Sequence, residues 1–372
     1  MAFLEINKNS IAHNLQLMRN FCDKNRSGMN KRARLPARKI KLCVVTKCCC
    51  SEEEIINLIF NSGVNEIADS NMSNFESLSS SLAGKLQKSV IKTRLSDIKL
   101  IPSLSPHSRP ERIFVSDETL LDALAEMPLD ICPDIMLIAE VGDFRDGFYT
   151  DQIPSICKNY SNLPITGIAA NYACLSGKMP DIKDAQYLSQ LAGKLKIKDP
   201  PLVSLGGTVA YQLFNDNRFW DSDGPGEGSC NWELRCGEGI FLGCDPPTGK
   251  ELAGFKQDAF TLFGEIIEIR EKEYSESGNK GYNAVGDHGV AFKTGKRLNI
   301  VVDFGVLSAP AKYLRAVDNA VEIVGQTFDF SIVDITESKQ KYKVGQHIGF
   351  VPSYGAVSHA MLNRYISKIY KI

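Results

Sequence analysis

A lone lysine ends an apolar run near the N-terminus, in the segment Lys41-Leu42-Cys43-Val44-Val45-Thr46-Lys47. Branched side chains of this kind indicate a strand that is buried on both faces. An amine at the end of a buried strand is partly desolvated, which disfavours its charged form and favours nucleophilic chemistry such as Schiff-base formation. The same heptad is compatible with a lysine that simply leaves the strand into solvent, so it does not decide between the two alone.

Other polar residues also follow apolar runs that we expect to be strands. They are Arg145, Asn171, Gly206-Gly207-Thr208 and Arg235-Cys236-Gly237-Glu238. If the strands form a parallel barrel, their carboxyl ends meet at one mouth, where catalysis is built. One amine, two guanidinium groups, a glycine-rich turn and a hydroxyl could then cradle a phosphorylated aldehyde cofactor, with Lys47 forming the imine and the turn holding the phosphate.

Each of these residues also has a structural interpretation. Arg145 could form an ion pair with Asp143 or Asp146, and Arg235 could do so with Glu233 or Glu238. Asn171 could cap a helix, and the role of the two glycines could be limited to forming a tight turn. The sequence leaves these alternatives open at each single position.

The elements that must position these residues alternate between strand and helix about eight times from residue 40 to 245. The expected strands are 41–47, 64–68, 90–93, 112–115, 134–141, 165–169, 202–205 and 239–242. The expected helices are 11–25, 51–62 (opened by a capping box at Ser51), 71–82, 116–127, 152–160 and 184–195. This α/β rhythm predicts a (β/α)₈ TIM-type barrel. An open doubly wound sheet is disfavoured, because no glycine-rich dinucleotide fingerprint follows the first strand.

After Asp245 the pattern changes to short alternating runs at 260–270, 297–303, 321–324, 330–333 and 347–351. Period-two alternation with intervening turn residues predicts an all-β domain. We therefore expect a barrel domain over residues 1–245 and a C-terminal β domain over residues 246–372.

Several segments, in order along the chain, resemble one known family. They are 4–6 with 11–15, 44–47, 140–147, 204–210, 234–243 and 354–356. The chain resembles the alanine-racemase-like (fold type III) pyridoxal-phosphate enzymes, and within them the ornithine racemase branch. The resemblance implies pyridoxal 5'-phosphate as cofactor. It also implies a cofactor-binding set of Lys47, Arg145, Asn171, Gly206, Gly207, Thr208, Arg235, Gly237, Glu238 and Tyr354.

Within this resemblance, Arg235 meets the pyridine nitrogen, Arg145 meets the ring oxygen and the substrate carboxylate, and Thr208 and Tyr354 meet the phosphate. A guanidinium cannot accept the proton that a carboxylate would take from the ring, so the cofactor stays a weaker electron sink. This favours an amino-acid racemase that removes the α-proton through a Lys47 Schiff base. A decarboxylase-like enzyme and a non-catalytic pyridoxal-phosphate-binding protein are the alternatives.

Racemisation also needs an acid or base on the opposite face of the substrate. Many family members use a tyrosine from the partner subunit's β domain, but the matching stretch 300–305 has none, and Cys48–Cys50 replace the tyrosine-containing segment after the lysine. Asp303 is therefore assigned with Lys47 as a catalytic residue. Tyr313 and a thiol of the cysteine cluster are further candidates.

The bulk composition limits the partners and the location. The formal net charge is -1 over 372 residues, which does not indicate binding to nucleic acid or to an anionic membrane. Eleven cysteines, three of them consecutive, predict free thiols in a reducing compartment rather than disulfides, and their spacing does not predict a metal site. Without an evident signal peptide or membrane span, we expect a cytoplasmic protein. By resemblance it acts on an amino acid as a homodimer with shared active sites.

Overall fold

The computed structural model describes residues 1–24, 40–195, 197, 200–221, 224–227, 230–275, 281–283, 285–286 and 293–372. The chain divides into two compact units. One comprises Ala12–Lys47 and Ser51–Phe255, and the other Met1–Ile11, Cys48–Cys50 and Lys256–Ile372. The N-terminal residues group with the C-terminal unit because β1 (Phe3–Asn7) pairs with β13 (Phe260–Tyr274) and β19 (Ser367–Lys371). The domain bounds 1–245 and 246–372 remain a prediction.

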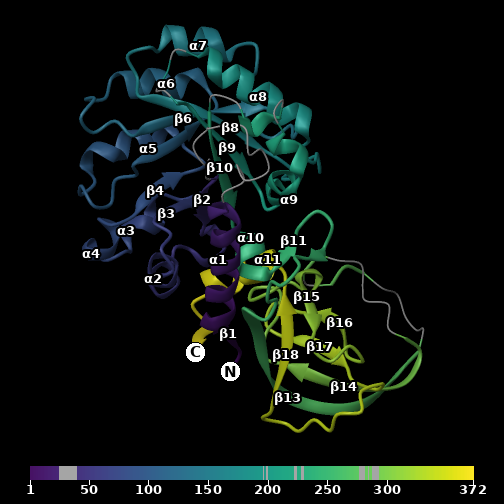
Figure 1. Cartoon of the computed structure of the whole chain (residues 1–372). Helices are drawn as coiled ribbons and strands as arrows, with labels where there is room; N and C mark the ends of the chain where they lie inside the picture. Colours follow the sequence, from purple (N-terminus) through teal and green to yellow (C-terminus); the bar gives the residue numbers. More distant parts are fainter. Residues whose placement is uncertain are drawn as a thin grey trace. The chain divides into compact units, whose positions relative to one another are not determined.

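In the first unit, eight parallel strands of the described residues form a closed barrel, as predicted (Figure 1). They are β2 (Ile40–Val45), β3 (Glu66–Asp69), β4 (Gln87–Val90), β5 (Arg112–Val115), β6 (Asp134–Glu140), β8 (Ile165–Asn171), β9 (Leu202–Gly206) and β10 (Asn231–Cys236). The order is β5-β4-β3-β2-β10-β9-β8-β6, and pairing of β5 with β6 closes the ring. A short strand, β7 (Phe148–Tyr149), pairs with the end of β6.

Helices connect these strands. Those of the first unit are α1 (Lys8–Asp23), α2 (Glu53–Asn61), α3 (Ser73–Glu76), α4 (Ser80–Ala83), α5 (Leu95–Leu100), α6 (Glu118–Ala125), α7 (Ile153–Asn159), α8 (Ile182–Lys194), α9 (Ala210–Asn215) and α10 (Glu238–Leu242), α1 beginning in the other unit. Within the described ranges, no helix combines the length and the apolar character needed to cross a bilayer.

Three local predictions were wrong. The segment 71–82 forms two short helices, α3 and α4, instead of one, because its serines and asparagines compete for backbone hydrogen bonds, as Ser77 does with the Asn74 carbonyl. The segment 239–242 is helical, and the last barrel strand is β10. The inward-facing charged residues of β10 interrupt the apolar run by which the other strands were predicted. Ser51 does not cap α2, whose N-cap residue is Glu52.

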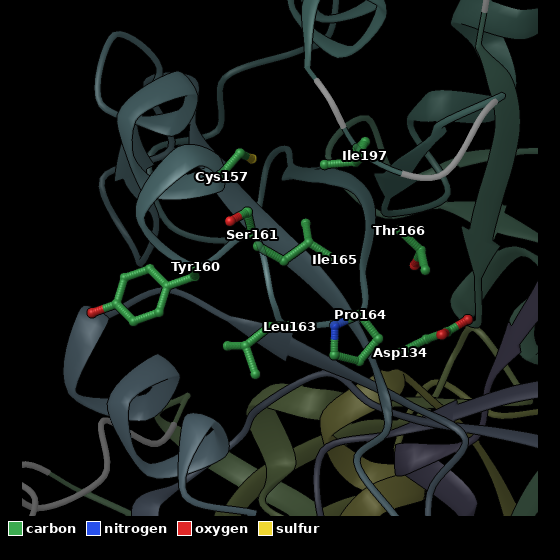
Figure 2. A pocket seen from close by; sticks show the side chains of 9 residues that line it. All are labelled: Asp134, Cys157, Tyr160, Ser161, Leu163, Pro164, Ile165, Thr166 and Ile197. Carbon is green, nitrogen blue, oxygen red and sulfur yellow. The ribbon is translucent and has the colours of Figure 1, made fainter. Parts of the chain in front are cut away.

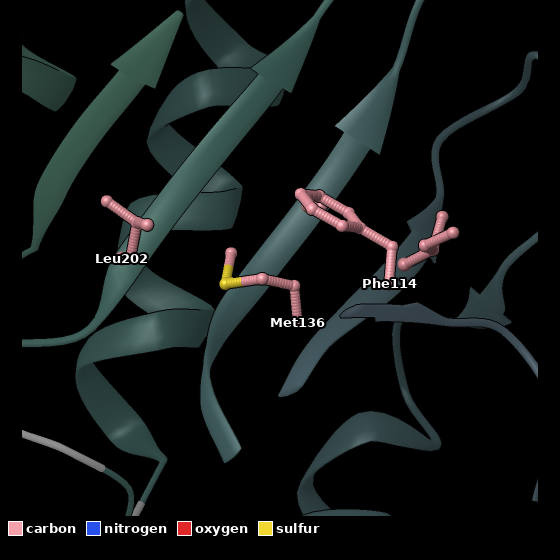
Figure 3. Packing of buried hydrophobic residues seen from close by; sticks show 5 residues of the cluster. Phe114, Met136 and Leu202 are labelled. Carbon is pink, nitrogen blue, oxygen red and sulfur yellow. The ribbon is translucent and has the colours of Figure 1, made fainter. Parts of the chain in front are cut away.

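The barrel interior is filled by side chains from several strands. Phe114, Met136, Ile138, Ala169 and Leu202 form one buried cluster, against which Ile91 packs (Figure 3). Across the barrel from β5, Glu233 of β10 lies 2.7 Å from the Arg112 guanidinium. Since β5 and β10 are not neighbours in the sheet, this contact crosses the interior. The barrel is therefore a packed core that includes charges, and not an open pore.

In the C-terminal unit, an eight-stranded sheet is built from the described residues. Its strands are β1, β13, β14 (Gly295–Val302), β15 (Leu314–Ala316), β16 (Glu322–Gln326), β17 (Ser331–Asp334), β18 (His347–Pro352) and β19. One helix, α11 (Tyr354–Leu362), follows β18. The predicted β domain is thus present, with an added N-terminal strand and one helix.

Candidate active site

The ends of β8, β9 and β10 bring three of the predicted site residues to one level. Strand register pairs Gly206 with Asn171 on one side and with Arg235 on the other. The Arg235 Nη2 donates to the Ala170 carbonyl at 2.9 Å and to Asn171 Oδ1 at 3.2 Å. A β-carbon at position 206 would lie 2.6 Å from that nitrogen. Glycine at 206 therefore lets the guanidinium and the amide meet.

Arg235 is buried in the barrel, and no carboxylate of the described residues is in direct contact with it. Its guanidinium lies 4.6 Å from the centre of the Phe114 ring, and its Nε has no hydrogen-bond partner in the described part of the chain. Burial lowers the pKa of Arg235 to about 10, an effect that the charge of Glu233 opposes, so the group stays protonated at neutral pH. The result is a charged, buried donor with one N–H available to a ligand.

The ion pair with Glu233, one of the two alternatives that the sequence left open for Arg235, is not formed. Glu233 instead accepts from Arg112 Nη2 at 2.7 Å and from Ser204 Oγ at 2.6 Å. The sequence offered Glu233 only as a possible partner of Arg235, and it did not single out Arg112, the first residue of β5. The signal for Glu233 was the alternation on β10, where residues 233 and 235 share one face.

Lys47 is exposed and opens a short 3₁₀ turn, Lys47–Cys49, directly after β2. Its positive charge acts on Glu238, the first residue of α10. Burial raises the pKa of Glu238 to about 7, against the lowering influence of Lys47. The last residue of β2 also abuts the end of β10, since a β-carbon at Gly237 would lie 2.7 Å from the Val45 carbonyl oxygen.

Arg145 forms the ion pair that the sequence allowed. Its Nε donates to Asp146 Oδ1 at 2.7 Å, and the same oxygen lies 3.5 Å from Asn171 Nδ2. Asp146 and Asn171 thus link the two arginines Arg145 and Arg235. The sequence offered Asp146 only as a partner of Arg145, not as a member of the site.

The loop that carries Arg145 is anchored by Asp143. The buried Asp143 carboxylate accepts from the backbone N–H groups of Cys174, Leu175 and Ser176, all through Oδ1. A carboxylate that accepts several backbone N–H groups is strongly held. Asp143 therefore fastens the loop after β6 to the loop after β8.

The glycine-rich turn after β9 is also well defined. Gly207 has a φ of +101°, which side chains rarely adopt, and its N–H donates to the Arg235 carbonyl at 3.1 Å. Thr208 is buried, and its hydroxyl accepts from the Gly239 N–H at 2.9 Å. The turn and the start of α10 are therefore joined through Thr208.

Comparisons with known proteins give a consistent result, although no family model matches the chain. The chain is 25% identical to the ornithine racemase of Acetoanaerobium sticklandii, over 98% of both chains. It is 24% identical to the lysine racemase of Thermotoga maritima, over 70% of this chain and 72% of that protein. The structure of alanine racemase from Bartonella henselae with covalently bound pyridoxal phosphate has a TM-score of 0.67 and 12% identity, covering 100% of this chain and 99% of that one.

The chain has the fold of alanine racemase and is similar in sequence, over nearly its whole length, to an ornithine racemase.

Three of the predicted residues lie in the C-terminal unit of the chain. Asp303 accepts from the Ala2 N–H at 2.8 Å and from the Glu265 N–H at 2.7 Å, so both of its oxygens bind backbone. Tyr313 packs against the start of α11, where a β-carbon at Gly355, next to Tyr354, would lie 2.9 Å from its ring. Tyr313 and the Tyr354 segment thus lie together, whereas Asp303 holds the N-terminal strand.

A pocket of about 350 Å³ lies at the other ends of the barrel strands. Its lining includes Asp134 and Ile165, the first residues of β6 and β8, and Tyr160, which follows α7 (Figure 2). The predicted site residues follow the carboxyl ends of their strands instead. In this alanine-racemase-like barrel the pocket is therefore separate from the candidate active site.

Proposed function

We propose that the protein is a pyridoxal-phosphate-dependent amino-acid racemase whose cofactor is attached to Lys47. The observation that carries the proposal is Arg235, which is buried, charged and hydrogen-bonded to Asn171, yet has an Nε without a partner among the described residues. An unsatisfied buried donor is costly unless a ligand completes it. The acceptor that fits it is an unprotonated pyridine nitrogen, so the residues present suit the cofactor.

The residues that would hold the cofactor follow the ends of the barrel strands. Lys47 supplies the covalent link, and the backbone of Gly206, Gly207, Gly237 and Glu238 with the Thr208 hydroxyl holds the phosphate. By the family resemblance, Tyr354 would be a further phosphate contact. Arg145 would contact the ring oxygen and the substrate carboxylate, and Asn171, which lies next to it, would belong to the same cofactor-binding set. When bound, pyridoxal phosphate supplies an electron sink that weakens the bond between the α-carbon and its hydrogen.

The chain's own groups then move the proton. The Lys47 amine takes it from the α-carbon on one face and can return it there. Arg235 cannot take up the ring proton, because a guanidinium stays charged at neutral pH. This limits the electron demand of the ring and favours reversible proton transfer over loss of the substrate carboxylate. Racemisation is completed when a second group donates a proton on the opposite face.

Asp303, Tyr313 and a thiol of the Cys48–Cys50 cluster are the candidates for that second group. The two backbone hydrogen bonds that Asp303 accepts give it a structural role, so we favour the Tyr313 hydroxyl. We further propose that the enzyme is a homodimer in which the partner supplies this group. We also propose a cytoplasmic location, because eleven cysteines, three of them consecutive, suit a reducing compartment.

Ornithine and lysine racemases are among the relatives, so we propose a basic α-amino acid as substrate. The purified protein, supplied with the cofactor, should absorb in the visible range. Borohydride reduction should then fix the cofactor to the peptide that contains Lys47. Lys47→Ala should lose both signals, while Lys41→Ala, at the other end of β2, should keep them.

The reaction itself is tested with L-ornithine or L-lysine in heavy water. Racemisation gives the D-isomer with deuterium at the α-carbon, and Tyr313→Phe should suppress it more than Asp303→Asn does. Exchange with retained configuration would exclude a racemase. Release of carbon dioxide would point to the decarboxylase-like alternative, and a bound cofactor without exchange would point to a binding protein.

A further inference from the structure

The turn that carries Lys47 is closed by a buried aspartate at the end of the neighbouring strand. Asp69, the last residue of β3, is fully buried. Its Oδ2 accepts from Ser51 Oγ at 2.9 Å and lies 3.3 Å from Thr46 Oγ1. The two hydroxyls lie 2.8 Å from each other. Since Thr46 and Ser51 flank the segment 47–50, one carboxylate oxygen holds both ends of the lysine turn.

The other oxygen of Asp69 holds the chain that follows β3. Its Oδ1 accepts from the Asn71 N–H and from Asn74 Nδ2, both at 3.0 Å. The carboxylate is therefore saturated and cannot turn away from the lysine turn without breaking these contacts. Thr46 is further fixed to β3, because its N–H donates to the Ala68 carbonyl at 2.8 Å.

The backbone of the turn is unusual. Cys50 and Ser51 are consecutive residues with φ values of +54° and +50°. Side-chain-bearing residues adopt this conformation rarely, and it persists only where surrounding contacts enforce it. The hydrogen bond between Ser51 and Asp69 is such a contact. Backbone strain of this kind is concentrated where a functional group must be held in one direction.

We propose that Asp69 is a positioning residue for Lys47. By holding Ser51 and Thr46 it closes the turn over residues 47–50 and fixes the direction in which the lysine side chain leaves β2. Asp69 touches neither cofactor nor substrate and acts only through the turn. The inference rests on the proposed role of Lys47, because a fixed direction matters only if that amine is the reactive one.

The test compares Asp69→Asn and Ser51→Ala with Asp97→Asn. Asp97 is a suitable control because it is also buried and also accepts a backbone hydrogen bond, from the Arg94 N–H at 2.9 Å at the start of α5. The first measurement is trypsin cleavage of the cofactor-free protein, relative to its other cleavage sites. We expect cleavage after Lys47 to become faster in Asp69→Asn and Ser51→Ala and to stay unchanged in Asp97→Asn.

The second measurement uses the cofactor-loaded enzyme. We expect Asp69→Asn to lower kcat about ten- to a hundredfold with little change in KM, because a misdirected base loses rate and not substrate binding. Ser51→Ala should lower kcat less, and it carries the test if Asp69→Asn does not fold. Losses of equal size in Asp97→Asn would mean a general stability effect and would overturn the proposal.

The two proposals fail in different ways. If the wild-type protein does not retain pyridoxal phosphate on Lys47, the proposed function is wrong, while the cleavage pattern still reports whether Asp69 closes the turn. If the cofactor binds and racemisation occurs, but Asp69→Asn leaves both the cleavage after Lys47 and kcat unchanged, then the positioning role of Asp69 is wrong.

Discussion

Glu238→Gln gives a direct test of the electrostatics at the site, through the pH dependence of stability. Burial raises the pKa of Glu238 from 4.5 to about 7, with Lys47 working in the opposite direction. The folded protein therefore binds this proton more tightly than the unfolded chain does. Ionising Glu238 lowers the free energy of unfolding progressively as the pH rises from about 4.5 to about 7. Above that interval the full loss is at most ~3 kcal/mol.

The glutamine variant lacks this titration. In urea unfolding of the cofactor-free protein, we expect the free energy of unfolding of Glu238→Gln to equal that of the wild type at about pH 4. At about pH 8 it should be higher than that of the wild type by about 1–3 kcal/mol. Glu251→Gln, at an exposed position on β12 (Lys250–Glu251), should show no such pH-dependent difference. A difference between Glu238→Gln and wild type that is the same at both pH values, or a wild type that is the more stable at the higher pH, would refute the reasoning.

Three further outcomes follow from single contacts. Gly206→Ala would place a β-carbon 2.6 Å from Arg235 Nη2. We therefore expect the free energy of unfolding to fall by about 1–3 kcal/mol and the visible cofactor band to weaken. An unchanged band would contradict this. Asp143→Ala leaves three backbone N–H groups without their acceptor. Urea unfolding should therefore show a free energy of unfolding that is lower by about 1–3 kcal/mol or more. The value of kcat should also fall, because the loop that carries Arg145 loses its anchor. Cys174 is the one cysteine of the eleven that is exposed. Burial raises the thiol pKa values of Cys132 and Cys244 to about 11. When the native protein is alkylated, peptide mass analysis should therefore find Cys174 labelled before Cys132 and Cys244.

The barrel was predictable because its signal is local. Each buried parallel strand is a short apolar run, and each connection contains a helix or a turn, so strand–helix alternation can be read residue by residue. The prediction was wrong at 239–242 because β10 carries Glu233 and Arg235 on its inward face, which breaks the apolar run. The partners of Glu233 are Ser204 of β9 and Arg112 of β5, and Arg112 lies 121 residues away in the sequence.

By itself, the sequence determined the elements and the residue types at their ends. Lys47, Arg145, Asn171 and Gly206 could be singled out because each follows an apolar run. Arg235 lies inside β10, which has no such run. Only the tertiary structure decided which of them meet, through strand register and barrel closure. It placed Asn171 and Arg235 on either side of Gly206, and it set Asp69 under the lysine turn. A barrel mouth is assembled from residues separated by tens to hundreds of positions, so no local pattern carries those contacts.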